Sequence, residues 1–245
     1  MPHSRGESAP LEGSHLPDVE VWLSSVHPPP ELFARFEASL SPEELSRAAR
    51  FRQDADRQRY VAGRGLARAL LGAELAMEPA QVPIVVNDAG RPVVKHSGDA
   101  ERVNFSVSHS GEWVLVATSR AHMVGVDVEL VRSEADLHSL ADTAFAPAER
   151  SALAEVPDAD LPAAFHATWT RREALTKAMG RGLRVSPELV EVSTELRGEP
   201  RVRSVPPEYG AADEWALHDL RLPDGYAGAL AVYPRPARVS AWRLR

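Results

Sequence analysis

The chain has 245 residues, enough to bury a core that needs no disulfide or metal for folding, and its 44% hydrophobic and 26% charged residues are typical of a globular protein. It contains no cysteine, which excludes a disulfide scaffold, a thiolate zinc site, an iron–sulfur cluster and a cysteine nucleophile. The net charge of −7 disfavours nucleic-acid binding. Because the sequence shows no signal peptide and no apolar run near the ~20 residues of a membrane helix, we expect a cytoplasmic protein without a membrane partner.

The first half of the chain is predicted to begin with a disordered tail and to continue with strands and helices. Residues 1–18 mix Pro, Gly, Ser and charged residues without periodicity, which is typical of disorder. Ser41-Pro42-Glu43-Glu44 is a helix start, with serine as N-cap, proline at the first helical position and glutamate at the third. The further elements predicted here are strands at 19–23, 83–86, 103–107 and 113–117, a helical stretch broken near Asp54, and a helix over 56–75.

The second half is predicted to have similar content. Its elements are a strand at 123–129, a helical region over 133–155, a helix over 161–179 that ends at Gly180-Arg181-Gly182, and strands at 189–194, 214–220, 226–233 and 238–243. No Pro/Gly/Ser-rich linker separates 19–122 from 123–245. We therefore predict an α/β (α+β) fold of two duplicated subdomains, related by a pseudo-twofold axis and packed as one compact unit.

Asp127 and Glu129 place two carboxylates on one face of an otherwise apolar strand, since side chains at i and i+2 of a strand point the same way. Buried like charges need a cation to stay ionised, and oxygen ligands suit a hard ion such as Mg²⁺. Gly125, just before them, leaves room for a close backbone approach. The alternative is a strand end that reaches solvent, where two acids need no partner.

The predicted helix over 161–179 carries a third candidate acid. Trp169, Glu173 and Lys177 are four residues apart and share one helix face, so Trp169 can anchor the helix while the other two face a site. Glu173 would then complete a set of three acids for Mg²⁺. The alternative is an ordinary surface ion pair between Glu173 and Lys177.

Ser106-Val107-Ser108-His109-Ser110-Gly111 follows a predicted strand and offers hydroxyls, an imidazole and a turn, which together suit an oxyanion. A serine hydrolase is disfavoured here because the Gly-x-Ser-x-Gly pattern is absent. The alternative is a polar hairpin turn. The chain also lacks a P-loop, a Gly-x-Gly-x-x-Gly motif and a His-Glu-x-x-His motif, which disfavours P-loop hydrolysis, a simple dinucleotide-binding dehydrogenase and a zincin.

Arginine dominates the basic residues, with 26 arginines and two lysines among the 28. Seven arginines fall within residues 47–68. Arg57, Arg64 and Arg68 are spaced as one stripe of a helix and could grip phosphates through their forked donors. The alternative is a solvated helix face.

Taken together and in this order, these motifs resemble the Sfp-type 4′-phosphopantetheinyl transferases. Residues 124–129 match that family's Gly-[Ile/Val]-Asp-x-Glu core, and residues 169–177 match its [Phe/Trp]-[Ser/Cys/Thr]-x-Lys-Glu-[Ala/Ser]-x-x-Lys helix. Residues 104–111 resemble its Ser-His-Ser-Gly segment and Gly90-Arg91-Pro92 its Gly-Lys-Pro turn. Residues 41–57 resemble its N-terminal basic region, although Glu44 stands where relatives often have a basic residue.

The resemblance covers about residues 19–235 and implies a monomeric enzyme that binds coenzyme A between its halves. Such enzymes use Mg²⁺, or alternatively Mn²⁺, to move the 4′-phosphopantetheine arm of coenzyme A to a serine of an apo acyl- or peptidyl-carrier protein, and they release 3′,5′-ADP. The carrier could belong to fatty-acid, polyketide or non-ribosomal-peptide synthesis, and the family implies docking near the arginine-rich region or residues 133–155.

The resemblance also implies roles for particular residues. Asp127, Glu129 and Glu173 would hold the metal at the diphosphate, with Glu173 as the base that takes the serine proton, directly or through a water on the metal. The residues implied to contact the diphosphate are Ser108, His109 and Lys177, of which His109 and Lys177 would also neutralise the leaving group. The implied nucleotide contacts are Gly90, Arg91, Pro92, Arg47 and Arg57, and Arg172 keeps a cation where the family has lysine.

Two other functions fit the same residues. A Mg²⁺-dependent phosphodiesterase or pyrophosphatase acting on a nucleotide would use the same three acids with water as the acceptor. A non-catalytic coenzyme A-binding protein would bind without turnover. The presence of all three acids favours the transferase.

Overall fold

The structure is a computed structural model that describes residues 18–95, 103–133, 136–180, 186–235 and 237–244. Its strands are β1 (Val19–Ser25), β2 (Ile84–Val86), β3 (Pro92–Val94), β4 (Asn104–Ser110), β5 (Trp113–Ser119), β6 (Met123–Leu130), β7 (Glu191–Val192), β8 (Val202–Ser204), β9 (Ala216–Asp219), β10 (Tyr226–Tyr233) and β11 (Val239–Arg243). Its α-helices are α1 (Pro30–Ala38), α2 (Pro42–Ala48), α3 (Asp54–Leu75), α4 (Leu137–Ala144), α5 (Pro147–Ala154) and α6 (Leu161–Ala178). Residues 1–17 of the tail predicted at 1–18, and Arg181-Gly182 of the predicted helix end, lie outside the described residues.

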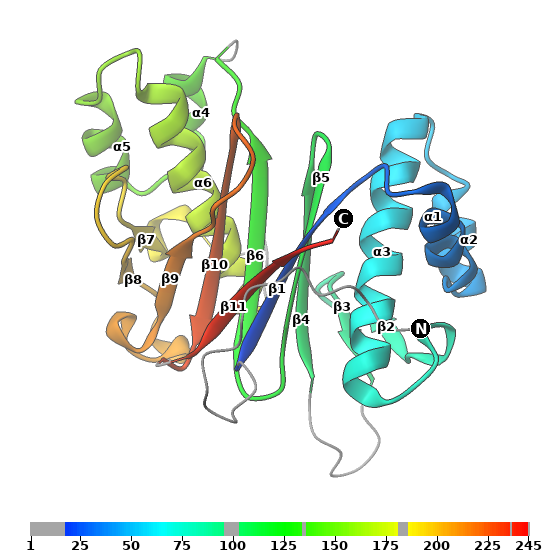
Figure 1. Ribbon diagram of the computed structural model, residues 1–245. Coiled ribbons are helices and arrows are strands. Elements are labelled where there is room, and N and C mark those ends of the chain that lie inside the picture. The colour runs from blue at the N-terminus through cyan, green and yellow to red at the C-terminus, as the bar shows by residue number, and fades with distance from the viewer. Residues whose placement is uncertain (1–17, 96–102, 134–135, 181–185, 236, 245) are drawn as a thin grey trace, which may run out of the picture.

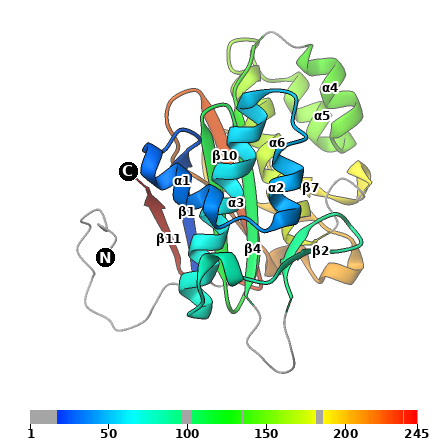
Figure 2. The same cartoon turned by 90° about the vertical axis from the view of Figure 1, so that its right-hand side faces the viewer.

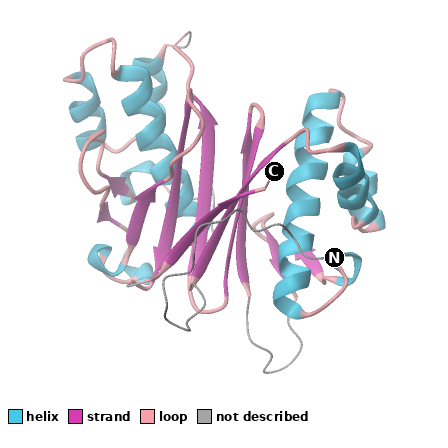
Figure 3. Cartoon of the chain, viewed as in Figure 1, coloured by secondary structure: helices cyan, strands magenta, loops and turns pink. Residues whose placement is uncertain are grey.

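Two sheets stand side by side in the middle of the molecule, with helices on both outer sides (Figure 1, Figure 3). One sheet has the strand order β11-β1-β5-β4 and the other β6-β10-β9. The long helix α3 packs on the first sheet and the long helix α6 on the second. One long helix thus packs on each sheet, which confirms the predicted α/β class.

Apolar side chains fill the space between the two sheets. Alternate residues of the strands face inward, as the period of two requires. The residues buried in this central core are Val19, Val21, Leu23, Leu115, Ala117, Val124, Val126, Val128, Leu230 and Val232. A second core lies between the first sheet and α3, and a third lies between the second sheet and α6. The sheets are therefore held together chiefly by burial of branched side chains.

Local signals placed most elements correctly. The Ser41 hydroxyl accepts from the Glu44 backbone N–H at 3.3 Å, and the Glu44 carboxylate accepts from the Ser41 N–H at 2.9 Å, so the predicted helix start is confirmed as the capping box of α2. The predicted helical region over 133–155 is two helices, because Pro147 begins a new helix at its first position. Helix α1 was not predicted, and its N-cap, Pro29, makes no side-chain cap.

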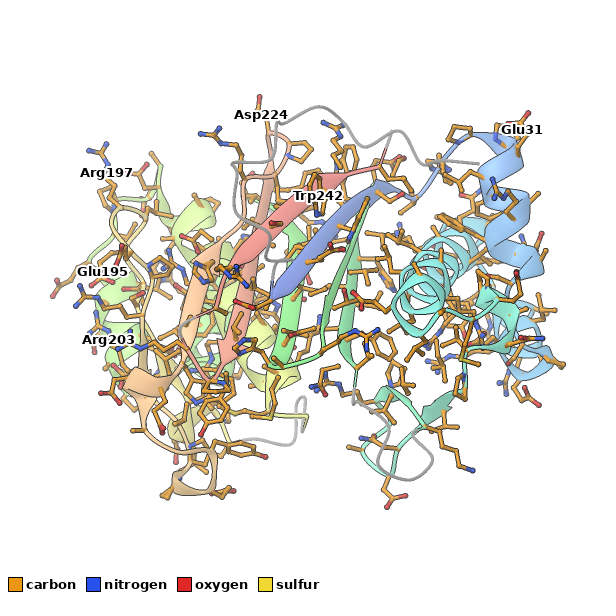
Figure 4. The ribbon with its side chains drawn as sticks, turned by 60° about the horizontal axis from the view of Figure 1, so that its bottom comes forward. Glu31, Glu195, Arg197, Arg203, Asp224 and Trp242 are labelled. Atoms are coloured by element: carbon orange, nitrogen blue, oxygen red, sulfur yellow. The ribbon has the colours of Figure 1, made fainter. Side chains whose placement is uncertain are left out.

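The first and last described strands meet in the first sheet. Strand β11 pairs in parallel with β1, so the last strand belongs to the sheet of the first half. Trp242 of β11, which Figure 4 labels, lies on this strand. Its ring stacks on that of Trp22 of β1 with the centroids 5.9 Å apart. Figure 2 shows α1, α2 and α3 covering one side of the strands, with the β2–β3 hairpin beside β4. Among the described helices, none is long and apolar enough to cross a membrane.

Candidate active site

The site is built where α6 lies directly against β6. Gly125 faces this helix, and a Cβ on it would lie 2.0 Å from the Ala174 carbonyl oxygen and 2.5 Å from the Ala178 nitrogen. Only glycine allows such an approach, so the predicted backbone contact at Gly125 is confirmed, with the helix as the partner. Strand alternation then turns Asp127 and Glu129 toward the same helix.

Asp127 is the centre of a buried polar cluster. Its Oδ1 accepts from the Ser108 hydroxyl at 2.7 Å and from the Lys177 ammonium at 2.6 Å. Lys177 also donates to the Ser108 oxygen at 3.0 Å and to the Val126 carbonyl at 3.2 Å. The three elements β4, β6 and α6 thereby converge on one carboxylate oxygen.

Glu129 and Glu173 lie on the side of this cluster that opens to a pocket. The Glu129 Oε2 accepts from the Ser110 hydroxyl at 2.7 Å. Burial raises the pKa of Glu129 above its usual value, against the Ser110 hydrogen bond, and the Asp127 charge raises it further. Burial, followed by the Asp127 charge, also raises the pKa of Glu173. The negative charges of the three acids therefore repel one another.

The donor set fits a divalent cation. The second oxygen of Asp127, Oδ2, is buried and has no hydrogen-bond partner among the described residues. A bound cation would satisfy this oxygen and relieve the repulsion among the acids, and three carboxylates are the oxygen ligands that Mg²⁺ prefers. Within the described part of the chain, no three His, Asp or Glu side chains are placed so that they could hold a metal ion as they stand, so the three acids would have to shift to bind one together.

The pocket beside these acids has a volume of about 600 Å³. It is bounded by the end of β6 and by α4 and α6. The lining residues include Glu129, Glu173, Trp169, Phe165, Leu140 and Arg132. Acids at one place and aromatic and aliphatic side chains at another suit a ligand with a charged end and an apolar end.

His109 and Arg59 lie together at the end of β4. Arg59 donates to the Gly111 carbonyl at 3.1 Å and to Asp56 at 2.6 Å. Desolvation lowers the pKa of His109, and the cations of Lys177 and Arg59 lower it further, so the three groups share one region of positive potential. Arg59 was counted in the arginine-rich segment but not singled out from the sequence.

Four other arginines of that segment have partners elsewhere in the first half. Arg57 donates to Glu37 of α1, and the Arg47 guanidinium lies 5.5 Å from the centre of the Tyr60 ring. Arg64 and Arg68 both contact the Glu44 carboxylate, at 3.2 Å and 2.6 Å. The predicted stripe of Arg57, Arg64 and Arg68 is thus paired with acids, and Arg68 is buried at 2% exposure.

Arg91 spans the two halves. The turn before it contains Gly90 in the left-handed region at φ 81°, which favours glycine. The Arg91 guanidinium donates to the Phe105 carbonyl at 3.0 Å, to the Val124 carbonyl at 3.3 Å, and to the Lys177 carbonyl. Burial lowers the pKa of Arg91. Its charge is therefore directed at backbone carbonyls of β4, β6 and α6.

Arg172 is buried and has its partners inside the protein. Its guanidinium donates to Glu149 at 2.6 Å and to the Pro187 carbonyl at 3.0 Å. Glu149, 1% exposed, also accepts from the Ala146 and Val192 backbone N–H groups, both at 2.8 Å. Glu149 was not predicted from the sequence, and its distance of 23 residues from Arg172 leaves no local pattern to find it by.

Two family models match this chain. The model described as 4′-phosphopantetheinyl transferase superfamily matches residues 123–231, and the model described as 4′-phosphopantetheinyl transferase, N-terminal, matches residues 24–121. The two models therefore divide the chain between them, one on each half.

Several proteins named as phosphopantetheinyl transferases or carrier-protein synthases are similar to this chain. The 4′-phosphopantetheinyl transferase HetI of Nostoc sp. is 33% identical over 215 residues, which are 88% of this chain and 87% of HetI. The 4′-phosphopantetheinyl transferase Sfp of Bacillus subtilis is 26% identical over 61% of this chain and 64% of its own length. A holo-(acyl-carrier-protein) synthase from Bacillus anthracis, solved in complex with CoA (3′,5′-ADP), is 24% identical, with a TM-score of 0.37 over 46% of this chain and 96% of that one.

Proposed function

Because the chain belongs to the 4′-phosphopantetheinyl transferase superfamily, its reaction is the transfer of the phosphopantetheine arm of coenzyme A to a serine of an apo carrier protein, and we propose that this takes place beside Glu129 and Glu173. The observation that carries the proposal is the buried, unpartnered Oδ2 of Asp127 at the meeting point of β4, β6 and α6. A site for a hard cation at a diphosphate needs such an oxygen.

We propose that Asp127, Glu129 and Glu173 hold the divalent cation, with Mg²⁺ as the working ion and Mn²⁺ as a substitute. The unpartnered oxygen of Asp127 and the raised pKa values of the two glutamates support this assignment. When bound, the ion supplies positive charge to the diphosphate of coenzyme A. The pocket of about 600 Å³ that Glu129 and Glu173 line leaves room for the substrate beside them.

In the proposed reaction the serine oxygen of the carrier forms a bond to the β-phosphorus of coenzyme A, and the bond from that phosphorus to the ADP oxygen breaks. The serine proton passes to the Glu173 carboxylate, whose raised pKa makes it a stronger base than an exposed glutamate. Lys177 and His109 stabilise the negative charge that grows on the leaving 3′,5′-ADP. The Lys177 ammonium lies 2.6 Å from Asp127 Oδ1.

Other residues are assigned to the nucleotide. We propose that Ser108 lies beside the diphosphate, where it accepts from Lys177, and that Arg59 joins His109 as a phosphate contact. The further residues that we place on the nucleotide side are Gly90, Arg91, Pro92, Arg47 and Arg57. Arg172, which is paired with Glu149, supports the position of Glu173 on α6 rather than reaching a phosphate directly.

The acceptor is proposed to be an acyl- or peptidyl-carrier domain that docks beside α4. Leu140 of α4 lines the pocket and is 46% exposed, and Arg132 at the same pocket offers a cation to an acidic carrier. We infer that the protein acts as a cytoplasmic monomer, because one chain already contains both halves.

Intact-mass spectrometry tests the proposal. An apo carrier protein incubated with this protein, coenzyme A and Mg²⁺ should gain the mass of one phosphopantetheine arm, and both EDTA and Asp127→Asn should abolish the gain. Cleavage of coenzyme A without a gain would instead indicate a phosphodiesterase. Intact coenzyme A and unchanged carriers of both types would indicate a protein that only binds.

A further inference from the structure

Strands β4 and β6 lie along the seam between the two halves, yet they belong to different sheets. Serine hydroxyls take the place of the usual backbone pairing. Alternate serines of β4 accept from backbone N–H groups of β6: Ser106 from Val126 at 3.1 Å, Ser108 from Val128 at 3.4 Å, and Ser110 from Leu130 at 3.1 Å. We call these three residues the serine ladder.

Two members of the serine ladder also hold a carboxylate. Ser108 donates to Asp127 Oδ1 and Ser110 donates to Glu129 Oε2, both at 2.7 Å. A hydroxyl has one proton, so each of these serines gives its only proton to an acid while its oxygen is fixed by the β6 backbone. At the equivalent position opposite Ser106 the chain has Gly125, which offers no side chain.

We propose that Ser110 is a positioning residue that orients Glu129 toward the cation, and that Ser108 does the same for Asp127. In each pair one carboxylate oxygen is bound by serine, and the carboxylate cannot rotate without breaking that bond. For Asp127 the other oxygen is the buried, unpartnered one. The inference rests on the proposed metal site, because it assigns the residues that orient two of its ligands.

The serine ladder also makes the cation site depend on both halves. The carboxylates come from β6 of the second half and the hydroxyls from β4 of the first. Any displacement of β4 relative to β6 therefore turns the carboxylates. Hydrogen-bond partners of this kind are worth about 10- to 100-fold in metal affinity where they have been removed from other sites.

The test compares two alanine variants, each of which loses one hydrogen bond between a β4 serine and a β6 backbone N–H. Ser110→Ala removes the bond to the Leu130 N–H and also releases Glu129, whereas Ser106→Ala removes only the bond to the Val126 N–H. The full chain is titrated with Mn²⁺ alone, and the free ion is followed by its electron paramagnetic resonance signal. Melting temperature is recorded for each variant.

Ser110→Ala should weaken Mn²⁺ binding about tenfold, while Ser106→Ala should bind Mn²⁺ as the unaltered protein does. The melting temperatures of the two variants should fall by similar amounts. Ser110→Thr keeps a hydroxyl and should restore binding. In turnover, Ser110→Ala should raise the Mg²⁺ concentration for half-maximal rate about tenfold, with the KM for coenzyme A at saturating Mg²⁺ little changed.

Equal weakening by the two alanine variants would overturn the inference, because it would show that the ladder only packs the halves together. Unchanged binding in Ser110→Ala, or lost binding in Ser110→Thr, would also overturn it. Failure of the unaltered protein to bind Mn²⁺ gives a different result, since it would reject the proposed metal site itself.

Discussion

Replacing Gly125 by alanine tests whether the closeness of α6 to β6 is what places the acids. The added Cβ would lie 2.0 Å from the Ala174 oxygen, whereas real Cβ atoms stay beyond 3.0 Å, so α6 would have to move by about 1 Å. Both atoms it meets are backbone and cannot rotate away. Overpacking costs about 1–3 kcal/mol, and we expect the upper end, about 3 kcal/mol.

The same displacement should damage catalysis. Glu173 and Lys177 each precede one of the two residues that the new methyl group strikes, so they move with the helix. A misplacement of about 1 Å can cost about 10²-fold in rate. We therefore expect Gly125→Ala to lose about 3 kcal/mol of unfolding free energy in urea and about 10²-fold in kcat at saturating coenzyme A and Mg²⁺.

Gly63→Ala is the matched control. Gly63 lies in α3, and the nearest atom to its added Cβ is a Val107 methyl carbon at 3.3 Å, which can shift slightly. Alanine is favoured over glycine inside a helix by about 1 kcal/mol, so this variant should be close to neutral in stability and activity. If Gly125→Ala folds as stably and turns over as fast as Gly63→Ala, the packing of α6 on β6 does not position the site.

Three other changes probe other parts of the molecule. Acidification should weaken Mn²⁺ binding in calorimetric titrations. Glu129 and Glu173 have raised pKa values, so they hold protons at a higher pH than exposed glutamates do, and they must lose these protons to bind a cation. An affinity independent of pH would contradict this. Glu149→Gln leaves its buried arginine partner unpaired and should cost about 3–5 kcal/mol in urea unfolding, and a loss below about 1 kcal/mol would show that the pair is replaceable. Arg59→Ala should raise the KM for coenzyme A about tenfold through loss of a charged hydrogen bond; an unchanged KM would show that Arg59 does not contact the nucleotide.

Patterns with a short range along the chain predicted the parts of the site that lie on single elements. Alternation along a strand was enough to put Asp127 and Glu129 on one face, and the missing side chain of Gly125 was enough to predict a close neighbour there. The spacing of four residues in α6 was likewise enough to group Trp169, Glu173 and Lys177 on one helix face. Of these, Trp169 and Glu173 line one pocket. These inferences needed only the geometry of one strand or one helix.

The partners of these residues depend on how the halves pack, and no local pattern contains that information. Ser110 and Glu129 are 19 residues apart and meet only because β4 and β6 adjoin at the seam. The arginines show the same limit, because Arg68 and Arg172 find buried acids 24 and 23 residues away. The alternation of serines at 106, 108 and 110 was visible in the sequence. Their hydrogen bonds to β6 are seen only when that strand lies beside β4.

Lys177 is a lysine for a geometric reason in a chain that has one other lysine and 26 arginines. Its ammonium has three protons and three acceptors: the Ser108 hydroxyl at 3.0 Å, the Val126 carbonyl at 3.2 Å and Asp127 Oδ1 at 2.6 Å. These acceptors surround a single atom, and the donors of a planar guanidinium diverge and cannot serve them together. A diphosphate oxygen can therefore reach this nitrogen only in exchange for one of the three.

Lys177→Arg should accordingly be damaging although it keeps the charge. The longer, flat head group would push against Asp127 and Ser108, and a shift of about 1 Å there corresponds to about 10²-fold in kcat. Lys95 is the only other lysine and is exposed, so Lys95→Arg is the matched control and should turn over normally. Both rates can be measured by carrier mass at saturating coenzyme A and Mg²⁺. Normal turnover by Lys177→Arg would mean that positive charge alone is required at this position, and that the convergence of three acceptors on one nitrogen has no part in the reaction.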